Sequence, residues 1–223
     1  TTFAKIINQL GKDKLKRFNE IATFANVFEI EPVHKGFWGA NYFKNTHPIV
    51  LELGCGRGEY TVNLAEKYPN KNFIGIDIKG ARIWRGAKTA IENNLHNVAF
   101  LRIEIESILD HFSAAEISEI WITFPDPQPQ ISRERKRLTS VRFLNYYQNI
   151  LKPNGIVHLK TDSDALYDFT HSLVQDKPIQ VLAATTDLYN DEMLDELLQI
   201  QTTYEKKYLA VGKNINYLKF SFE

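Results

Sequence analysis

The stretch that decides the fold reads PIVLELGCGRG and covers residues 48–58. It begins as a short apolar run, which predicts a buried strand, and ends in a glycine-rich turn that leads into a helical pattern over residues 58–68. Alternating strands and helices continue to the end of the chain, which is typical of a mostly parallel α/β sheet with helices on both faces. The other strands are predicted at 72–77, 98–103, 119–124, 155–161, 179–184 and 215–222. The last of them alternates apolar and polar residues, so we expect it to be antiparallel within a seven-stranded sheet.

Further helices are predicted at 79–94, 139–151, 163–176 and 191–209. The first 45 residues have weaker periodicity and many aromatic side chains. We therefore expect an arm over residues 1–45, which either packs on the domain or becomes ordered around a ligand, and one domain over residues 46–223. A chain of 223 residues is long enough for one large domain with its own core.

Composition excludes several classes of protein. The chain is 43% hydrophobic and 24% charged, which is ordinary for a globular protein and excludes a disordered one. The single cysteine, Cys55, cannot form an internal disulfide, and no cysteine–histidine cluster has zinc spacing, so we expect no metal. No apolar run approaches the ~18 residues that span a bilayer. These features predict a soluble cytoplasmic protein.

Charge is balanced overall but unevenly distributed along the chain, with 27 basic and 27 acidic residues. Residues 187–196 are acidic, whereas basic residues gather in three places: in the arm at Lys5, Lys12, Lys14, Lys16 and Arg17, at every third position from Lys79 to Lys88, and between Arg133 and Arg142. Each basic patch is either a solvated surface or a contact for nucleic-acid phosphates.

The glycine-rich turn predicts a cofactor site. Parallel sheets bind ligands beyond the carboxyl ends of their strands, and glycines at 54, 56 and 58 let the backbone approach a ligand there. A dinucleotide fingerprint has glycine where this chain has Glu59. That difference disfavours NAD and favours S-adenosylmethionine.

Acidic residues follow the strands that flank this turn. Glu52 is predicted to hold the ammonium group of the cofactor, and Asp77, at the end of the second strand, its ribose hydroxyls. Glu104 or Glu106 is predicted to receive the adenine amino group, and a surface acid is the alternative for either.

The fourth predicted strand ends in Phe124-Pro-Asp126-Pro, where two prolines hold the aspartate in a stiff turn at the same edge of the sheet. Asp-Pro turns are also found with a purely structural role. The basic run from Arg133 to Arg137 follows soon after. An acid beside a cluster of bases is typical of a site that takes a polyanion and orients one neutral base within it.

The motifs are Glu52-x-Gly54-x-Gly56-x-Gly58, Gly75-Ile-Asp77, Phe124-Pro-Asp126-Pro, Arg135-Lys136-Arg137-Leu-Thr139, His158-Leu-Lys-Thr161-Asp162 and Thr202-Thr-Tyr204-Glu205. In this set and order the chain closely resembles the bacterial tRNA (guanine-N7)-methyltransferases, in particular their Bacteroidetes-type branch. The resemblance runs from about residue 48 to residue 220. It implies a Rossmann-like class I fold, dependence on S-adenosylmethionine, and methyl transfer to N7 of guanine 46 in the variable region of tRNA.

The resemblance also implies roles for individual residues. Glu52, Asp77 and Glu104 bind the cofactor together with the three glycines, and Asp126 belongs to the same site and is needed for activity. The residues that the resemblance assigns to the guanine are Asp162, Thr202, Tyr204 and Glu205. The basic run of Arg133, Arg135, Lys136 and Arg137 is expected, from its charge, to contact phosphates of the tRNA. The commoner family pattern has tryptophan and lysine where this chain has Gln128 and Gln130, so Gln130 receives no substrate role.

N7 of guanine carries a lone pair and no proton, so its attack on a methyl group needs no general base. Asp126 and Asp162 are expected either to stabilise the positive charge that moves to the purine or to recognise its N1–H and amino group. The alternatives are a methyltransferase for another RNA, a protein or a small molecule, a nicotinamide-dependent reductase, and a non-catalytic tRNA-binding module.

Overall fold

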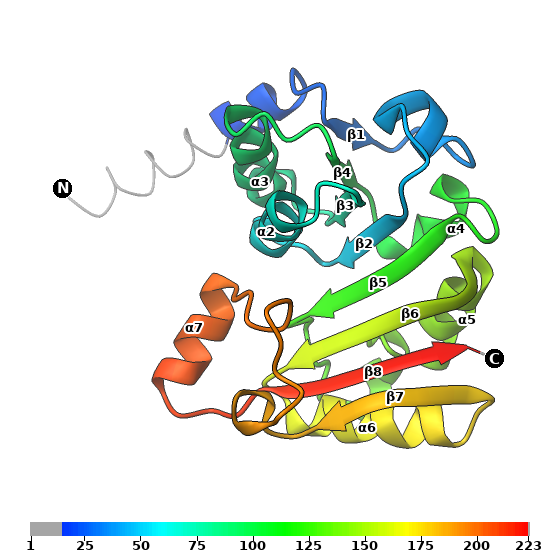
Figure 1. The fold of residues 1–223 in the computed structure, drawn as a ribbon, viewed down its shortest axis with the longest axis vertical. Helices are drawn as coiled ribbons and strands as arrows, with labels where there is room; N and C mark the ends of the chain where they lie inside the picture. The colour runs from blue at the N-terminus through cyan, green and yellow to red at the C-terminus, as the bar shows by residue number, and fades with distance from the viewer. Residues whose placement is uncertain (1–14, 223) are drawn as a thin grey trace.

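A computed structural model of the protein describes residues 15–222, and its centre is an eight-stranded sheet (Figure 1). The strand order is β1-β4-β3-β2-β5-β6-β8-β7. The strands are β1 (Val27–Glu29), β2 (Ile49–Leu53), β3 (Asn72–Ile76), β4 (Val98–Arg102), β5 (Ile117–Thr123), β6 (Leu151–Thr161), β7 (Ile179–Thr185) and β8 (Asn216–Phe222). β1 to β6 pair in parallel, whereas β8 is antiparallel to both of its neighbours, β6 and β7. The predicted antiparallel last strand is therefore confirmed.

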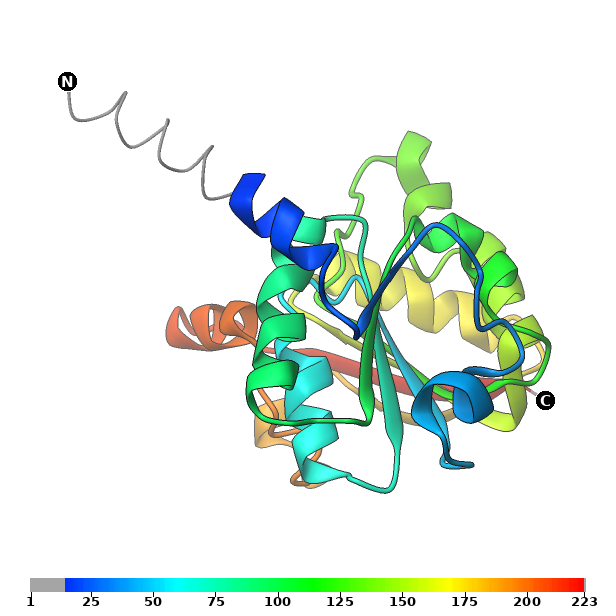
Figure 2. The same cartoon turned by 90° about the horizontal axis from the view of Figure 1, so that it is seen from above.

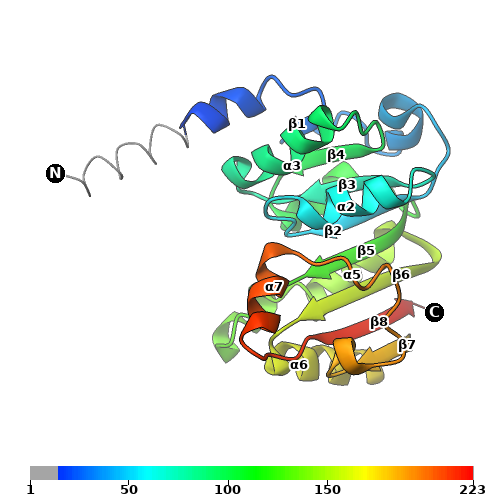
Figure 3. The same ribbon diagram turned by 60° about the vertical axis from the view of Figure 1, so that its left-hand side comes forward.

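Helices cover both faces of this sheet (Figure 2). The longer ones are α2 (Glu59–Lys67) and α3 (Gly80–Glu92) on one face, and α5 (Val141–Ile150) and α6 (Asp164–Gln175) on the other. The short α4 (Ile108–His111) packs with α5, and α7 (Thr203–Ala210) stands beside the carboxyl ends of β5 and β6 (Figure 3). Short helical turns cover Trp38–Phe43, Ile105–Ser107, Ile131–Lys136 and Leu188–Asn190.

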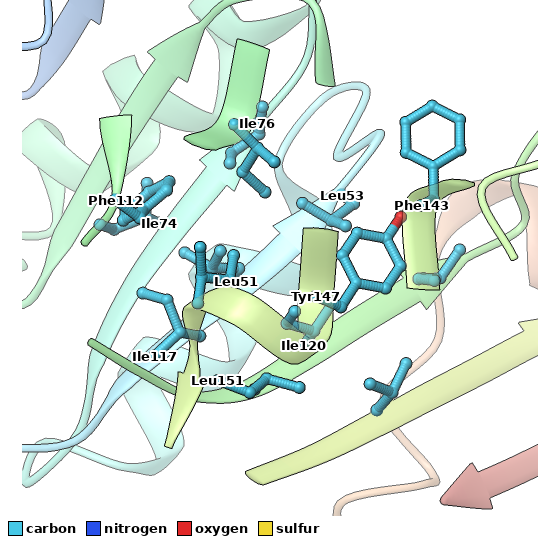
Figure 4. Packing of buried hydrophobic residues seen from close by; sticks show 14 of the residues in the cluster. Leu51, Leu53, Ile74, Ile76, Phe112, Ile117, Ile120, Phe143, Tyr147 and Leu151 are labelled. Atoms are coloured by element: carbon cyan, nitrogen blue, oxygen red, sulfur yellow. The ribbon is translucent and has the colours of Figure 1, made fainter. Parts of the chain in front are cut away.

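The core follows from the alternation of side chains along each strand. Leu51 of β2 and Ile74 of β3 are fully buried on the face that packs against Tyr147 of α5 (Figure 4). Their neighbours on the opposite face, such as Val50, pack with Ala87 of α3. Because both faces of the central strands are buried, these strands appear in the sequence as continuous apolar runs.

The sequence predicted seven strands, and the count is eight because the arm contributes β1. Val27 of β1 lies opposite Phe100 of β4, and the Phe100 amide donates to the carbonyl of Asn26 (2.8 Å). The Asn26 side chain donates to the carbonyl of Ala87 in α3 (3.0 Å). The described part of the arm is thus joined to the edge of the sheet. The predicted basic residues Lys5, Lys12 and Lys14 lie outside the described residues.

The predicted helix over 191–209 is wrong up to residue 202, since α7 begins only at Thr203. The Lys160 ammonium lies beneath this segment and donates to the carbonyls of Leu198 (2.9 Å) and Ile200 (3.3 Å). A regular helix would bond these carbonyls to its own amides. The segment instead runs irregularly over the sheet before α7.

The sheet has a topological switch point between β2 and β5. From β2 the chain adds β3 and β4 toward one edge, and from β5 it adds β6 toward the other. Loops that follow two such strands diverge and leave a crevice at their carboxyl ends. In this protein they are the glycine turn at 54–58 and the loop that begins at Phe124, the two motifs singled out in the sequence.

Candidate active site

The glycine turn after β2 has a backbone that favours glycine at each of its three motif positions. Gly54, Gly56 and Gly58 have φ angles of +73°, +56° and +67°. A Cβ at Gly58 would lie 2.5 Å from the Phe100 ring and 3.2 Å from the Cα of Gly86, so this position is closed by packing as well. A Cβ at Gly54 or Gly56 would meet no atom nearer than 3.9 Å. The turn therefore packs tightly on its α3 side and leaves open space around Gly54 and Gly56.

Glu52, in β2 just before the turn, is a buried acid with three hydrogen-bond donors. Its Oε2 accepts from the amide (2.9 Å) and the hydroxyl of Thr61, and its Oε1 accepts from the Thr123 hydroxyl (2.8 Å). Burial raises the pKa of this carboxyl to about 7, against the opposing effect of these hydrogen bonds. Glu52 is thus placed where its charge is costly unless a cation approaches.

Asp77, directly after β3, fixes the shape of the turn. One of its oxygens accepts from the Gly56 amide (3.0 Å) and the other from the Lys79 amide (2.8 Å). The amides of Gly54 (2.8 Å) and Cys55 (3.0 Å) donate to the carbonyl of Ile76. Backbone and carboxylate together tie the glycine turn to the end of β3.

A cavity of about 320 Å³ lies at the switch point and joins several of the predicted residues. Its lining includes Glu52, Gly54, Gly56, Asp126, Thr202 and Tyr204. We call it the central cavity. The acid at the end of β2 and the acid after β5 therefore face one common space, although 74 positions separate them in the sequence.

Asp126 is exposed at the wall of the central cavity. Its Oδ1 accepts from the Gln128 amide (3.1 Å), and Phe124 and Gln128 have positive φ angles of 49° and 44°. These two left-handed residues, with the prolines between them, fold the loop tightly around the aspartate. Its second carboxylate oxygen has no partner within residues 15–222.

The start of α7 closes the opposite wall of the central cavity. Thr202 caps the helix, since its hydroxyl accepts from the Glu205 amide (3.1 Å), and the Glu205 carboxylate accepts in return from the Thr202 amide (3.3 Å). Thr202 and Tyr204 line the cavity, but Glu205 does not. The Glu205 carboxylate is fully buried and lies 2.6 Å from the Lys160 ammonium.

Glu59, the first residue of α2, ties α7 to the glycine turn. Its two oxygens accept from the amide and the hydroxyl of Thr203, each at 2.6 Å. From the sequence, Glu59 was interpreted only as a departure from a dinucleotide fingerprint, and its contact with Thr203 was not predicted. The capping box Thr202-x-x-Glu205 is a local signal that could have located the start of α7.

Other predicted residues lie away from the central cavity. Asp162 forms an ion pair with Lys213 (2.8 Å) and lines a separate cavity next to α6. Glu104 is exposed and lines a third cavity, of about 730 Å³, with Ile30 and Pro32 of the arm, whereas Glu106 is not among its lining residues.

The predicted basic loop divides into two kinds of residue. Arg133, Arg135 and Lys136 are exposed on the helical turn after Gln130. Arg137 is buried, donates to the Gln128 carbonyl (3.3 Å), and lies 4.3 Å over the Phe169 ring. Arg137 thus holds the base of the loop, while the other three side chains remain free to meet a partner.

Within the described residues, no group of three or more histidine, cysteine, aspartate or glutamate side chains could hold a metal ion. No helix among those residues is both long and apolar enough to cross a bilayer.

Comparisons with known proteins relate this geometry to a family. Residues 46–218 match a family model described as putative methyltransferase. The chain is 52% identical over 224 residues to a tRNA (guanine-N(7)-)-methyltransferase of Christiangramia forsetii, which covers 96% of this chain and 99% of that protein. It is 47% identical to the protein of the same name from Bacteroides thetaiotaomicron, over 95% of this chain and 86% of that one. Among solved structures, the 16S rRNA methyltransferase KamB superposes with a TM-score of 0.62 at 14% identity, over 81% of this chain and 90% of that one, which supports the fold.

Proposed function

This chain belongs to the family of tRNA (guanine-N7)-methyltransferases, and we propose that it methylates N7 of guanine 46 in the variable region of tRNA. S-adenosylmethionine is the methyl donor. The observation that carries the proposal is the central cavity, in which Glu52, the glycine turn, Asp126 and the start of α7 meet. A tRNA substrate also leads us to expect that the enzyme works in the cytoplasm.

The residues around the central cavity suit S-adenosylmethionine, which supplies a methyl group bonded to a positively charged sulfur. Gly54 and Gly56 leave room for ligand atoms next to the backbone, and the buried Glu52 would hold the ammonium group. Asp77 is not among the residues that line the central cavity, but it is bonded to the Gly56 amide at its border. It would accept the ribose hydroxyls, because each of its oxygens uses one hydrogen bond on a backbone amide and keeps a further lone pair. Glu104 remains the proposed contact for the adenine amino group.

Asp126 is proposed as the catalytic residue. Methyl transfer to N7 moves positive charge onto the purine, and a carboxylate at the cavity wall stabilises that charged state more than neutral guanine. Because N7 has no proton, no residue is required to act as a base. The free oxygen of Asp126 is the group with which this chain would stabilise the positive charge on the purine.

The start of α7 and the basic surfaces are proposed to bind the tRNA. Thr202 and Tyr204 lie in the cavity wall that a guanine would face, and the buried Glu205 supports them from below. Arg133, Arg135 and Lys136 would contact phosphates, and Asp162 would reach the substrate from the α6 side. In this proposal residues 46–223 form the catalytic domain and the arm, residues 1–45, extends its RNA-binding surface.

The test is methyl transfer from labelled S-adenosylmethionine into unmodified tRNA. Borohydride reduction followed by aniline cleaves RNA at N7-methylguanosine, so we expect one cleavage, at guanine 46. A tRNA in which adenine replaces this guanine is the matched control and should take up no label. Label that persists in the control tRNA, or cleavage at a different guanine, would refute the assigned position. Absence of label in any tRNA would refute the proposed activity.

A further inference from the structure

A second cleft adjoins the central cavity on the side of the arm. It has a volume of about 500 Å³ and is bordered by the helical turn at residues 15–21, the glycine turn, α3 and α7. Four arginines line it: Arg17, Arg57, Arg82 and Arg85. We call it the arginine cleft. The helical turn at residues 15–21 lies beside α3 in the ribbon views (Figures 1 and 3). Arg17 of this turn lines the same cleft as Arg82 and Arg85 of α3.

The charge of the arginine cleft is not balanced within the described residues. None of the four arginines forms an ion pair within residues 15–222. The single acid in the lining is Glu59, and both of its oxygens already accept hydrogen bonds from Thr203. Four guanidinium groups in one concave surface create a positive potential that attracts anions.

The basic residues that recur at every third position up to Lys88 have two kinds of surroundings on α3. The Lys88 ammonium pairs with Glu20 of the arm (3.1 Å), and the Trp84 indole donates to the same carboxylate (2.9 Å). The Arg17 guanidinium lies 4.9 Å from the centre of the Trp84 ring. These contacts hold the arm against α3 and use the charge of Lys88, whereas Arg82 and Arg85 stay exposed on the cleft side.

The arginine cleft opens directly into the central cavity. The two share Arg57, Arg82 and Tyr204, so a ligand could occupy both without a break. Beyond the shared arginines, the central cavity is lined by the acids Glu52 and Asp126 and by Lys207 of α7. The two acids would repel a phosphate but accept an uncharged base. A nucleotide strand has this pattern of charge, with a neutral base attached to a chain of phosphates.

We propose that the arginine cleft binds the phosphates that flank the target guanine while the base enters the central cavity. The guanidinium fork matches phosphate oxygens in pairs, so four arginines suit two consecutive phosphates. The sequence pattern does not distinguish Arg82 and Arg85 from Lys88, and it indicates no role for Arg57 beyond its place in the glycine motif. This inference rests on the proposed function, because it takes tRNA to be the substrate.

The first test compares the salt dependence of tRNA binding for the full chain and its variants. Each lost phosphate contact should lower the slope of log Kd against log salt by about 0.7 to 0.9, so Arg82→Gln/Arg85→Gln should lose about 1.5 units. The exposed Lys152→Gln, which lies outside the arginine cleft, is the control and should retain the wild-type slope. Calorimetry with S-adenosylhomocysteine should give the same Kd for Arg85→Gln as for the wild type, because Arg85 lines the arginine cleft and not the central cavity.

The second test locates the contact on the RNA. A tRNA with uncharged methylphosphonates on both sides of the target guanine should bind the wild type with the reduced slope of the double variant. The double variant retains Arg17 and Arg57, so it should distinguish this RNA from ordinary tRNA less than the wild type does. A double variant that keeps the wild-type slope would overturn the proposal, and so would a loss of S-adenosylhomocysteine affinity by Arg85→Gln equal to its loss of tRNA affinity. These are binding measurements without turnover, so a failure of methylation would count against the proposed function alone.

Discussion

The ionisation of Glu52 should make the stability of the ligand-free protein fall as pH rises. The pKa of this buried carboxyl is raised from 4.5 to about 7 because burial removes the charged form from water. A raised folded-state pKa means that the stabilising contribution is complete below pH 4.5 and is lost as pH rises through 7. A shift of this size corresponds to about 3 kcal/mol in the free energy of unfolding. Glu52→Gln cannot ionise and should lack this loss. The free energy of unfolding of the variant minus that of wild type should therefore be up to about 3 kcal/mol larger above pH 8 than at pH 4.5.

The same group should couple donor binding to pH in the opposite direction. If the ionised carboxylate holds the ammonium group, only the ionised form binds well, and that form rises from about one tenth of molecules at pH 6 to about nine tenths at pH 8. Affinity for S-adenosylhomocysteine should therefore rise about tenfold over this range, with about half a proton released per binding event at pH 7.

Two assays measure these effects. Urea denaturation at a series of pH values gives the stability of wild type and Glu52→Gln, and calorimetry in two buffers of different ionisation enthalpy gives the number of protons released. The reasoning is refuted if the two proteins show parallel stability profiles, or if the affinity of wild type for S-adenosylhomocysteine is the same at pH 6 and pH 8.

Three further substitutions test other parts of the site. Asp126→Asn should lower the single-turnover rate of tRNA methylation by about a hundredfold or more while tRNA binding changes little, and a near-normal rate would exclude its catalytic role. Glu59→Ala removes both hydrogen bonds to Thr203 and should raise KM for tRNA about tenfold, with Glu59→Gln retaining part of the affinity; equal KM values in all three proteins would show that α7 needs no such link. Glu205→Gln leaves the buried Lys160 ammonium without its charged partner and should cost about 3 to 5 kcal/mol in urea denaturation, whereas a change below about 1 kcal/mol would contradict the buried ion pair.

The fold was largely predictable because its signals are local. Each central strand is an apolar run bounded by turn residues, and such a run shows its character within a few positions. β1 was missed because it has only three residues and depends on pairing with Phe100, more than 70 positions away. The segment before α7 was misassigned for a similar reason. Its sequence has a helical pattern, but two of its carbonyls accept hydrogen bonds from the buried ammonium of Lys160, which belongs to β6.

The sequence predicts those site residues whose place follows from the order of the strands. It does not predict those whose role depends on a side-chain partner elsewhere in the chain. Acids that follow parallel strands gather at one edge, and this is why Glu52 and Asp126 could be placed together from the sequence. No pattern reveals that Glu205 meets Lys160 beneath the cavity or that Arg137 packs on Phe169. A charged residue in a motif can equally touch the substrate or hold the residues that do.

Separation of charge at this site follows from its two ligands, because the donor is a cation and the acceptor a polyanion. Acidic side chains that attract the cationic donor would repel the phosphates of the tRNA if the phosphates came close to them. The chain limits this conflict by enclosing Glu52 in the sheet and placing Arg85 on the exposed surface of α3, in the arginine cleft and outside the central cavity. A partly buried charge is screened little by salt and an exposed one strongly. Raising the ionic strength should therefore weaken tRNA binding much more than donor binding, although the net charge of the whole chain is zero.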